Sequence, residues 1–248
     1  SHADEEALIA IAEASSAQRI ELDIRSLVQF GTRHTLSETE SEERGIGAAR
    51  RWIEAEFNAI SKDCGGCLKV YTQSRVFQGT PRIPDPTEVV NVIAVLQGMS
   101  DQNRYVIMSG DIDSRVTDAM DATSDSPGAN DNASGIAMML TLMKYFSENN
   151  PEYSVLFIAF GGEEAGLLGS KYYVENPIVP LNKMKFLYNV DMMGTGSEGI
   201  QVVNSTEHPK EFERLKAINK KYDLVKVIKP RGKAANSDHY WFEEAGVP

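Results

Sequence analysis

Along most of the chain, short runs rich in Val, Ile, Phe and Tyr alternate with longer stretches whose apolar residues recur at helical spacing. The short runs predict β-strands at residues 68–76, 89–96, 105–109, 153–160, 184–190 and 200–203. The helical spacing predicts α-helices at residues 5–27, 41–60, 134–146, 164–174 and 209–222. Strands that alternate with helices typically build one sheet with helices on each side. We therefore expect an α/β fold of three layers, in which a mixed, mostly parallel β-sheet is flanked by helices on both faces.

The length of 248 residues fits one domain with a single substantial core. No internal repeat, low-complexity tract or linker divides the sequence, so we expect residues 1–248 to form one domain. No apolar run approaches the roughly 20 residues that a membrane-spanning helix needs, so we expect no membrane span. The formal net charge of −11 would repel phosphates, which argues against a nucleic-acid partner.

The two cysteines lie close together, as Cys64-Gly65-Gly66-Cys67. This spacing occurs in redox pairs, but the βαβ context of a thioredoxin-like protein does not surround it. A zinc site would need two further ligands, and the sequence has no second cysteine pair. We favour a short structural disulfide over free thiols, and a disulfide requires an oxidising compartment. We therefore expect a secreted or periplasmic protein, in which Ser1 to Asp4 is typical of a cloning remnant before a processed terminus.

Several acidic residues follow predicted strands or precede a predicted helix, and one imidazole comes later in the chain. These residues are Asp111, Asp113, Asp131, Glu163, Glu164, Asp191 and His239. Ligand sites of open α/β sheets form beyond the carboxyl ends of strands, so we expect these side chains to converge there. A single Asp in such a place is most often a turn former or a helix cap. The pair Glu163-Glu164 is more informative, because adjacent carboxylates at a buried edge repel each other unless cations or protons offset them. One arrangement would bind metal through one carboxylate and use the other to hold the proton of a metal-bound water.

Other polar residues receive a plainer interpretation. Asp118, Asp121 and Asp125 lie in a loop that we interpret as solvated. His34 is either structural or on the substrate side of the site, and His208 is typical of a residue at a helix start.

Four segments, in this order and at this spacing, resemble a known family of enzymes. They are PGANDNASG (127–135), AFGGEEAGLLGS (159–170), NVDMMG (189–194) and SDHYWF (237–242). The chain resembles, over residues 88–242, the zinc metallopeptidase family that includes bacterial leucyl aminopeptidases, glutamate carboxypeptidases and, as relatives, glutaminyl cyclases.

The resemblance implies a centre that holds two zinc ions. The matching ligands are Asp131, which would bridge the two ions, Glu164 and His239 on one ion, and Asp191 on the other. Glu163 would be the general acid/base. The resemblance also implies that the peptide bond between Asp131 and Asn132 is cis.

One motif departs from the family pattern. The family's His-x-Asp reads Asp111-Ile112-Asp113 here, so a carboxylate replaces an imidazole ligand. The second ion would then be bound by Asp111, Asp131 and Asp191, and an all-oxygen site suits Mg²⁺, Mn²⁺ or Ca²⁺ better than one with His. We therefore expect one tight zinc site, and a second site that is weaker or takes a different divalent cation. In the family, the Asp at the position of Asp113 orients that imidazole, so Asp113 loses this partner here. We count Asp113 as a catalytic residue.

The expected function is that of a zinc-dependent aminopeptidase, which hydrolyses N-terminal residues from peptide substrates by means of a metal-activated water. One alternative is an enzyme with a single zinc ion of the glutaminyl cyclase kind, which the loss of the motif's His favours. Another is a degenerate member that binds peptides or glycans without cleaving them, although Glu163 would then have no use. Family members usually continue with a strand and a closing helix beyond Gly246-Val247-Pro248, so we expect these elements to be absent here.

Overall fold

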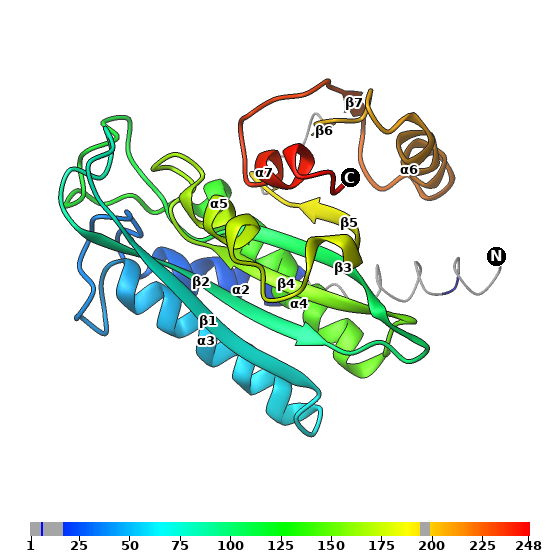
Figure 1. Cartoon of the computed structure of the whole chain (residues 1–248), viewed down its shortest axis with the longest axis horizontal. Coiled ribbons are helices and arrows are strands. Elements are labelled where there is room, and N and C mark those ends of the chain that lie inside the picture. The colour runs from blue at the N-terminus through cyan, green and yellow to red at the C-terminus, as the bar shows by residue number, and fades with distance from the viewer. Residues whose placement is uncertain (1–5, 7–16, 194–198) are drawn as a thin grey trace.

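The computed structural model of the chain describes residue 6 and residues 17–193 and 199–248. A five-stranded sheet forms the middle layer, with the strand order β1-β2-β4-β3-β5 (Figure 1). Its strands are β1 (Leu68–Phe77), β2 (Thr87–Leu96), β3 (Asp101–Asp111), β4 (Tyr153–Phe160) and β5 (Met184–Asn189). The described helices are α2 (Ala17–Val28), α3 (Ile46–Asp63), α4 (Ser134–Glu148), α5 (Leu168–Glu175), α6 (Pro209–Tyr222) and α7 (His239–Glu244), with short helical turns η1 (Ala129–Ala133) and η2 (Leu181–Lys183).

Strand β2 runs against its neighbours, since it pairs antiparallel with both β1 and β4. Strands β4, β3 and β5 pair parallel to one another. Four of the five strands therefore point the same way, and the predicted mixed, mostly parallel sheet is confirmed.

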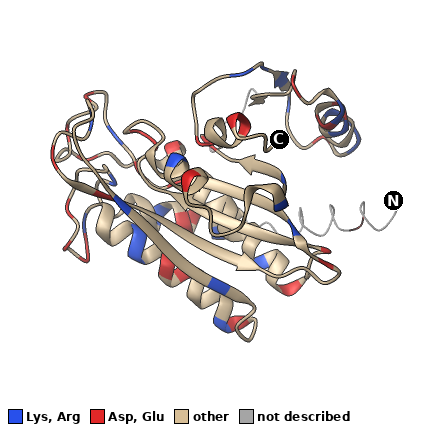
Figure 2. Ribbon diagram, in the orientation of Figure 1, with Lys and Arg blue, Asp and Glu red and all other residues tan. Residues whose placement is uncertain are grey.

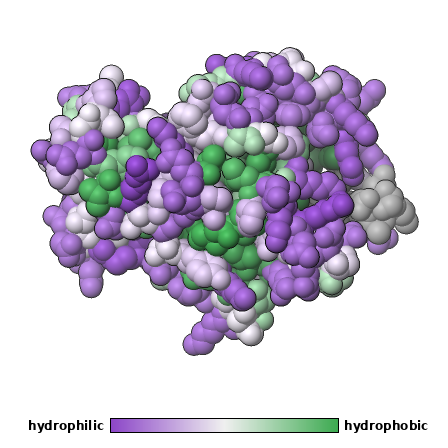
Figure 3. Space-filling model, viewed as in Figure 1, coloured by the Kyte–Doolittle hydropathy of each residue, from purple (hydrophilic) through white to green (hydrophobic). Residues whose placement is uncertain are grey.

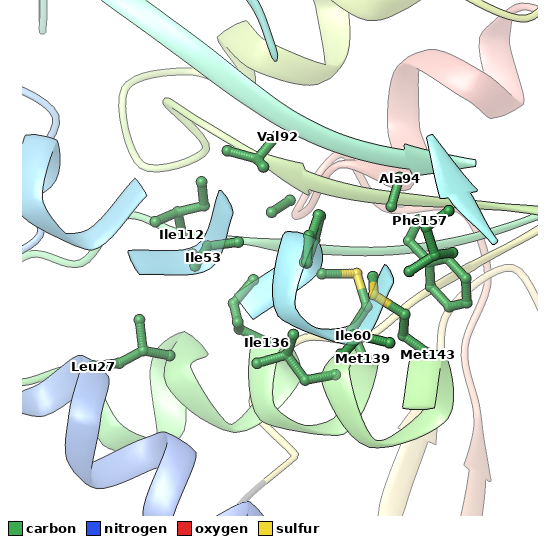
Figure 4. Close-up of a cluster of buried hydrophobic side chains, with 14 of the residues drawn as sticks. Leu27, Ile53, Ile60, Val92, Ala94, Ile112, Ile136, Met139, Met143 and Phe157 are labelled. Carbon is green, nitrogen blue, oxygen red and sulfur yellow. The ribbon is translucent and has the colours of Figure 1, made fainter. Parts of the chain in front are cut away.

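The apolar side chains of β4 alternate between two cores. Val155, Phe157 and Ala159 pack with helices α2, α3 and α4 on one face (Figure 4). Leu156 and Ile158 pack on the other face with residues of α5 and α7. Because successive side chains of a strand point to opposite faces, an unbroken apolar run such as β4 requires cover on both sides. The three-layer prediction is confirmed.

Two helices begin later than predicted. Helix α3 begins at Ile46 instead of residue 41, because the Ser41 hydroxyl accepts hydrogen bonds from the N–H groups of Glu43 and Arg44 and holds them in a turn. Helix α5 begins at Leu168 instead of residue 164, for a reason that belongs to the site described below.

The helix predicted at residues 5–27 is described from Ala17, with residue 6 also helical, and residues 5 and 7–16 lie outside the described part. Strand β5 ends at Asn189, one residue before the predicted end, and Gly194 of the NVDMMG segment lies outside the described part as well.

The strand predicted at 200–203 forms, but not in the main sheet. It is β6 (Ile200–Val202), which pairs parallel with β7 (Ile228–Pro230) in a separate two-stranded sheet. Helix α6 joins these two strands, and its many lysines make this part basic although the whole chain is acidic (Figure 2). Neither β7 nor α7 was predicted, because elements of three and six residues show too little periodicity.

Cys64 and Cys67 form a disulfide just after α3, with their Cα atoms 5.5 Å apart, which confirms the predicted bridge. Among the described residues, no helix is both long and apolar enough to cross a membrane. Most of the face seen in Figure 3 is hydrophilic, and apolar side chains reach the surface mainly in its middle and on its left.

Candidate metal centre

The parallel strands β3, β4 and β5 bring three loops to one edge of the sheet. Asp111, the last residue of β3, lies beside Phe160, the last residue of β4. Ser109 lies beside Asn189, the last residue of β5. The loops that follow these strands carry the acidic residues identified in the sequence, as the rule for carboxyl ends of strands predicts.

Asp111 and Asp113 are both fully buried at this edge. Asp111 Oδ1 accepts a hydrogen bond from Asn132 Nδ2 at 2.9 Å, and its Oδ2 is buried without a partner. Asp113 accepts hydrogen bonds from the backbone N–H groups of Glu163 and Glu164, at 3.0 and 2.9 Å. Asp113 therefore holds the acidic pair in place through its main chain.

This use of the backbone N–H groups also explains the late start of α5. Because Glu163 and Glu164 give their N–H groups to Asp113, the chain leaves β4 in a tight turn before the helix starts. Gly162 and Gly166, with φ angles of 65° and 117°, allow that turn.

Asp131 lies between the other carboxylates. Its peptide bond to Asn132 is cis, as the resemblance implied. Burial first, and then the charges of Asp191 and Glu164, raise the pKa of its carboxyl group. Asn132 fixes this loop to β3 and β5, because its amide donates to Asp111 Oδ1 and to the carbonyl of Val190.

Gly135 lets the loop approach that closely. A Cβ atom at Gly135 would lie 2.5 Å from the side-chain amide of Asn132 and 2.6 Å from the carbonyl oxygen of Val190. Such contacts are too short for carbon, so the small residue is required where helix α4 begins.

Two other carboxylates complete the cluster. Asp191 Oδ2 accepts a hydrogen bond from the Ser237 hydroxyl at 2.8 Å, while its Oδ1 is buried without a partner. Asp238 is fully buried, with Oδ1 bound to the Ser170 hydroxyl at 2.7 Å and Oδ2 without a partner. Sequence reasoning did not assign a role to Asp238, although it stands beside His239 in a motif that the resemblance used.

The crowding of these groups disfavours their charged forms. Burial, and then the neighbouring carboxylates, raise the pKa of Glu163 to about 11 and that of Asp131 to about 7. Burial likewise raises the pKa of Asp111 and of Asp238 well above the usual range. Burial raises the pKa of Asp113 only to about 6, because the two backbone N–H groups that it accepts oppose the shift. The site therefore needs protons or positive charge to stay compact.

The donors fit a divalent cation. Buried carboxylate oxygens without partners, on Asp111, Asp191 and Asp238, are costly unless a cation or a proton satisfies them. Carboxylate and imidazole groups are also the ligands that zinc accepts in catalytic sites. Even so, no three His, Cys, Asp or Glu side chains in the described ranges are grouped so that they could hold an ion without adjustment.

Two contacts show where adjustment is needed. Arg115 Nε donates to Glu164 Oε2 at 2.6 Å and so takes up an oxygen of a predicted ligand. His239 Nε2 lies 2.8 Å from the carbonyl oxygen of Ala234, and Asp191 is among the charges that act on the ring. The predicted ligand set and the number of ions therefore stay predictions.

The structure also shows a supporting segment that sequence reasoning did not identify. Residues 31–35, between α2 and α3, contact the segment that follows β3: Arg33 N–H donates to Ser114 Oγ, and Thr35 Oγ1 donates to Asp113 Oδ2 at 3.2 Å. His34 is buried, with its ring bound to the N–H of Leu36 and to the carbonyl of Ala119. These contacts support the structural interpretation of His34. The signal in the sequence was a short polar segment, with no strand or helix period, between two predicted helices.

The loop of Asp118, Asp121 and Asp125 remains exposed, as expected. Asp121 accepts hydrogen bonds from the backbone and hydroxyl groups of Thr123 and Ser124, which lower its pKa to about 2. His208 directly precedes the first residue of α6, which agrees with its expected place at a helix start.

Comparison with known proteins connects this geometry with a family. The chain is 42% identical, over 199 residues, to a protein of Leptosphaeria maculans named "Probable zinc metalloprotease", a match that covers 79% of this chain and 46% of that protein. It is 34% identical, over 137 residues, to aminopeptidase YwaD of Bacillus subtilis, with 53% and 30% covered. The chain thus spans less than half the length of these two curated relatives.

Among solved structures, a glutaminyl cyclase of Bacteroides thetaiotaomicron superposes with a TM-score of 0.73 at 20% identity, covering 92% of this chain and 80% of that one. At this identity the likeness concerns the fold. Residues 91–248, which hold every predicted ligand and the acidic pair, match peptidase family M28. The chain therefore belongs to peptidase family M28.

Proposed function

We propose that this chain carries the catalytic centre of a zinc-dependent aminopeptidase that removes N-terminal residues from peptides. The supporting observation is the cluster of buried carboxylates with unpartnered oxygens, next to a Glu pair that Asp113 holds by its main chain. The aminopeptidase relative at 34% identity favours this reaction within the family. Asp111, Asp131, Glu164, Asp191 and His239 would hold the metal.

Zinc, when bound, supplies a water of lowered pKa and polarises a peptide carbonyl. Glu163 takes the proton of the attacking water at its carboxylate and delivers it to the leaving amine. Its pKa of about 11 reflects burial first and then the neighbouring carboxylates. Cations beside the other carboxylates would lower that pKa, because an opposite charge favours the ionised form, and Glu163 would then act as a base near neutral pH.

Asp113 positions the Glu163-Glu164 pair and takes no direct part in the reaction. Its two hydrogen bonds to the backbone of Glu163 and Glu164 fix where the two side chains start, so one can bind metal while the other faces the water. It therefore has a partner here although the imidazole that the resemblance assigns to it is missing.

A matched pair of variants tests the assignment. Glu163→Gln and Glu164→Gln are isosteric changes at adjacent residues, and each removes one carboxylate. We expect Glu163→Gln to keep zinc, measured by elemental analysis, and to lose at least ~10²-fold in the rate of amino-acid release from peptide amides. We expect Glu164→Gln to lose zinc. Equal loss of zinc in both variants, or an active Glu163→Gln, would contradict the roles given to the pair.

A glutaminyl cyclase activity is the second candidate, because Asp111 stands where the family has a His and so favours a single zinc ion. Peptides with N-terminal Gln separate the two reactions, since a cyclase releases ammonia and an aminopeptidase releases the free amino acid. Zinc binding without either product would favour a chain that binds peptides or glycans only. The disulfide between Cys64 and Cys67 supports a further proposal, that the protein works in an oxidising compartment, secreted or periplasmic.

A further inference from the structure

Arg33 is a charged side chain at the centre of the fold. It lies in the segment between α2 and α3, and only 1% of it is exposed. Its guanidinium donates to main-chain carbonyl oxygens of Leu27, Ile112, Pro127 and Gly128, at 2.7 to 3.2 Å. None of these acceptors is a carboxylate, so the contacts of Arg33 fix backbone rather than pair charges.

Three of the four carbonyls belong to loops that carry predicted metal ligands. Ile112 lies between Asp111 and Asp113, and Pro127-Gly128 leads into Asp131. One rigid, planar group thus holds two loops that are separate in sequence. The main chain of Arg33 joins the same assembly, because its N–H donates to Ser114 Oγ and its carbonyl accepts from the N–H of Ser114.

Gly128 shows how closely these parts fit. A Cβ atom at Gly128 would lie 2.7 Å from Arg33 Nη2 and 2.5 Å from the carbonyl oxygen of Asp131. The φ angle of 51° at Gly128 also favours glycine. The guanidinium reaches the Asp131 loop because no side chain stands between them.

The charge of Arg33 acts on the site as well. Burial lowers its pKa to about 10, and the carboxylates of Asp111, Asp113 and Asp131 oppose that shift. Arg33 therefore stays positively charged at neutral pH. By Coulomb's law a fixed positive charge near the ligands should weaken the binding of a cation. Its position and its charge thus make opposite contributions to metal affinity.

We propose that Arg33 is a positioning residue for the metal centre. Arg33 sets the distance between the Asp111 loop (residues 111–114) and the Asp131 loop (residues 127–132) so that both can bind the same ion. The inference rests on the proposed function, because it assumes that these loops bind zinc. Residues that orient metal ligands are commonly worth 10- to 100-fold in metal affinity. Lysine cannot replace such a residue, since its single ammonium lacks the planar fork that reaches several acceptors.

The test is the zinc dissociation constant of the second site, which Asp111, Asp131 and Asp191 would form, measured at pH 7.5 by competition with a chromophoric chelator after the tight site is filled, with no substrate present. Arg33→Lys keeps the charge and loses the fork, and we expect zinc binding to weaken about 10-fold or more. Arg33→Met loses both, and we again expect weaker binding. Gly128→Ala keeps Arg33 but places a Cβ atom 2.7 Å from Arg33 Nη2, so the guanidinium must move. This variant should therefore weaken zinc binding too.

Phe57→Leu is the control for a simple loss of stability. Phe57 is a fully buried core residue of α3, and no described hydrogen bond joins it to either loop. At a matched loss of melting temperature, this variant should bind zinc as the wild type does. If Arg33→Met does not fold, the zinc affinities of Arg33→Lys and Gly128→Ala still test the positioning role.

The other possible outcomes would contradict the positioning role of Arg33. If Arg33→Lys binds zinc normally and Arg33→Met binds it more tightly, Arg33 acts through its charge alone and the positioning role is wrong. If all variants bind as Phe57→Leu does, Arg33 serves stability alone and the inference is equally wrong. A wild-type protein that binds no zinc would overturn the proposed function and this inference together, whereas normal zinc binding with unaffected variants would overturn the inference alone.

Discussion

Raising the pH should destabilise the metal-free protein, because its buried carboxyl groups are protonated more readily in the folded state than in the unfolded chain. Asp113 has the usual pKa of 3.8 when unfolded and about 6 when folded. Between these values the folded state binds more protons, so the free energy of unfolding falls as pH rises. The contribution of Asp113 to the free energy of unfolding is fully present below about pH 4. It is lost as the pH rises through the folded-state pKa of Asp113.

The size of the effect follows from the shift. Roughly two pKa units at 1.36 kcal/mol each give about 3 kcal/mol for Asp113, which is fully buried. Asp131, with a pKa of about 7, extends the same loss toward neutral pH, though its partial exposure reduces its share. A loss of about 3 kcal/mol lowers the melting temperature of a chain of this size by roughly 6–12 °C. Asp121 acts in the opposite direction, but its pKa of about 2 places its effect below pH 4.

The assay is thermal unfolding of chelator-treated protein between pH 4.5 and 8, with and without excess zinc. We expect the melting temperature of the metal-free protein to fall from pH 5 to 7.5. We expect the stabilisation by zinc to grow over the same interval, because metal ligands must be deprotonated. Asp113→Asn should show a shallower fall. A metal-free melting temperature that is flat or rises over this interval would refute the reasoning.

Two further predictions concern single positions. Titration of zinc into metal-free protein should show one tight equivalent, and Asp111→His should restore a second of similar affinity, since it returns a nitrogen ligand; two tight equivalents in the wild type would contradict the weak-site interpretation. Gly135→Ala should lower both stability and zinc affinity, because its Cβ would meet the Asn132 amide and the Val190 carbonyl at about 2.5 Å. Calorimetry and chelator competition measure the two effects, and a Gly135→Ala protein with wild-type values in both would show that the loop has room to move.

Much of the fold is determined by local pattern. The run at residues 153–160 has no polar residue but Ser154, so it had to be a strand covered on both faces, and β4 spans the same eight residues. Helix α6 begins at Pro209 and ends at Tyr222, as predicted. Such elements are predictable because each depends on the spacing of neighbouring side chains. The short strand β7 and helix α7 carry too few residues to show a period.

The candidate site was likewise predictable from the sequence only in part. The sequence alone identified Asp111, Glu163 and Asp191, because residues after the ends of parallel strands share one edge of the sheet. Only the tertiary structure brought Arg33 to Ile112 and Pro127, which are 79 and 94 residues away in the chain. Only the tertiary structure left Asp238 buried with an oxygen unpartnered. Local sequence decides which elements form and where they end, whereas the cost of burying a charge depends on what the folded chain places around it.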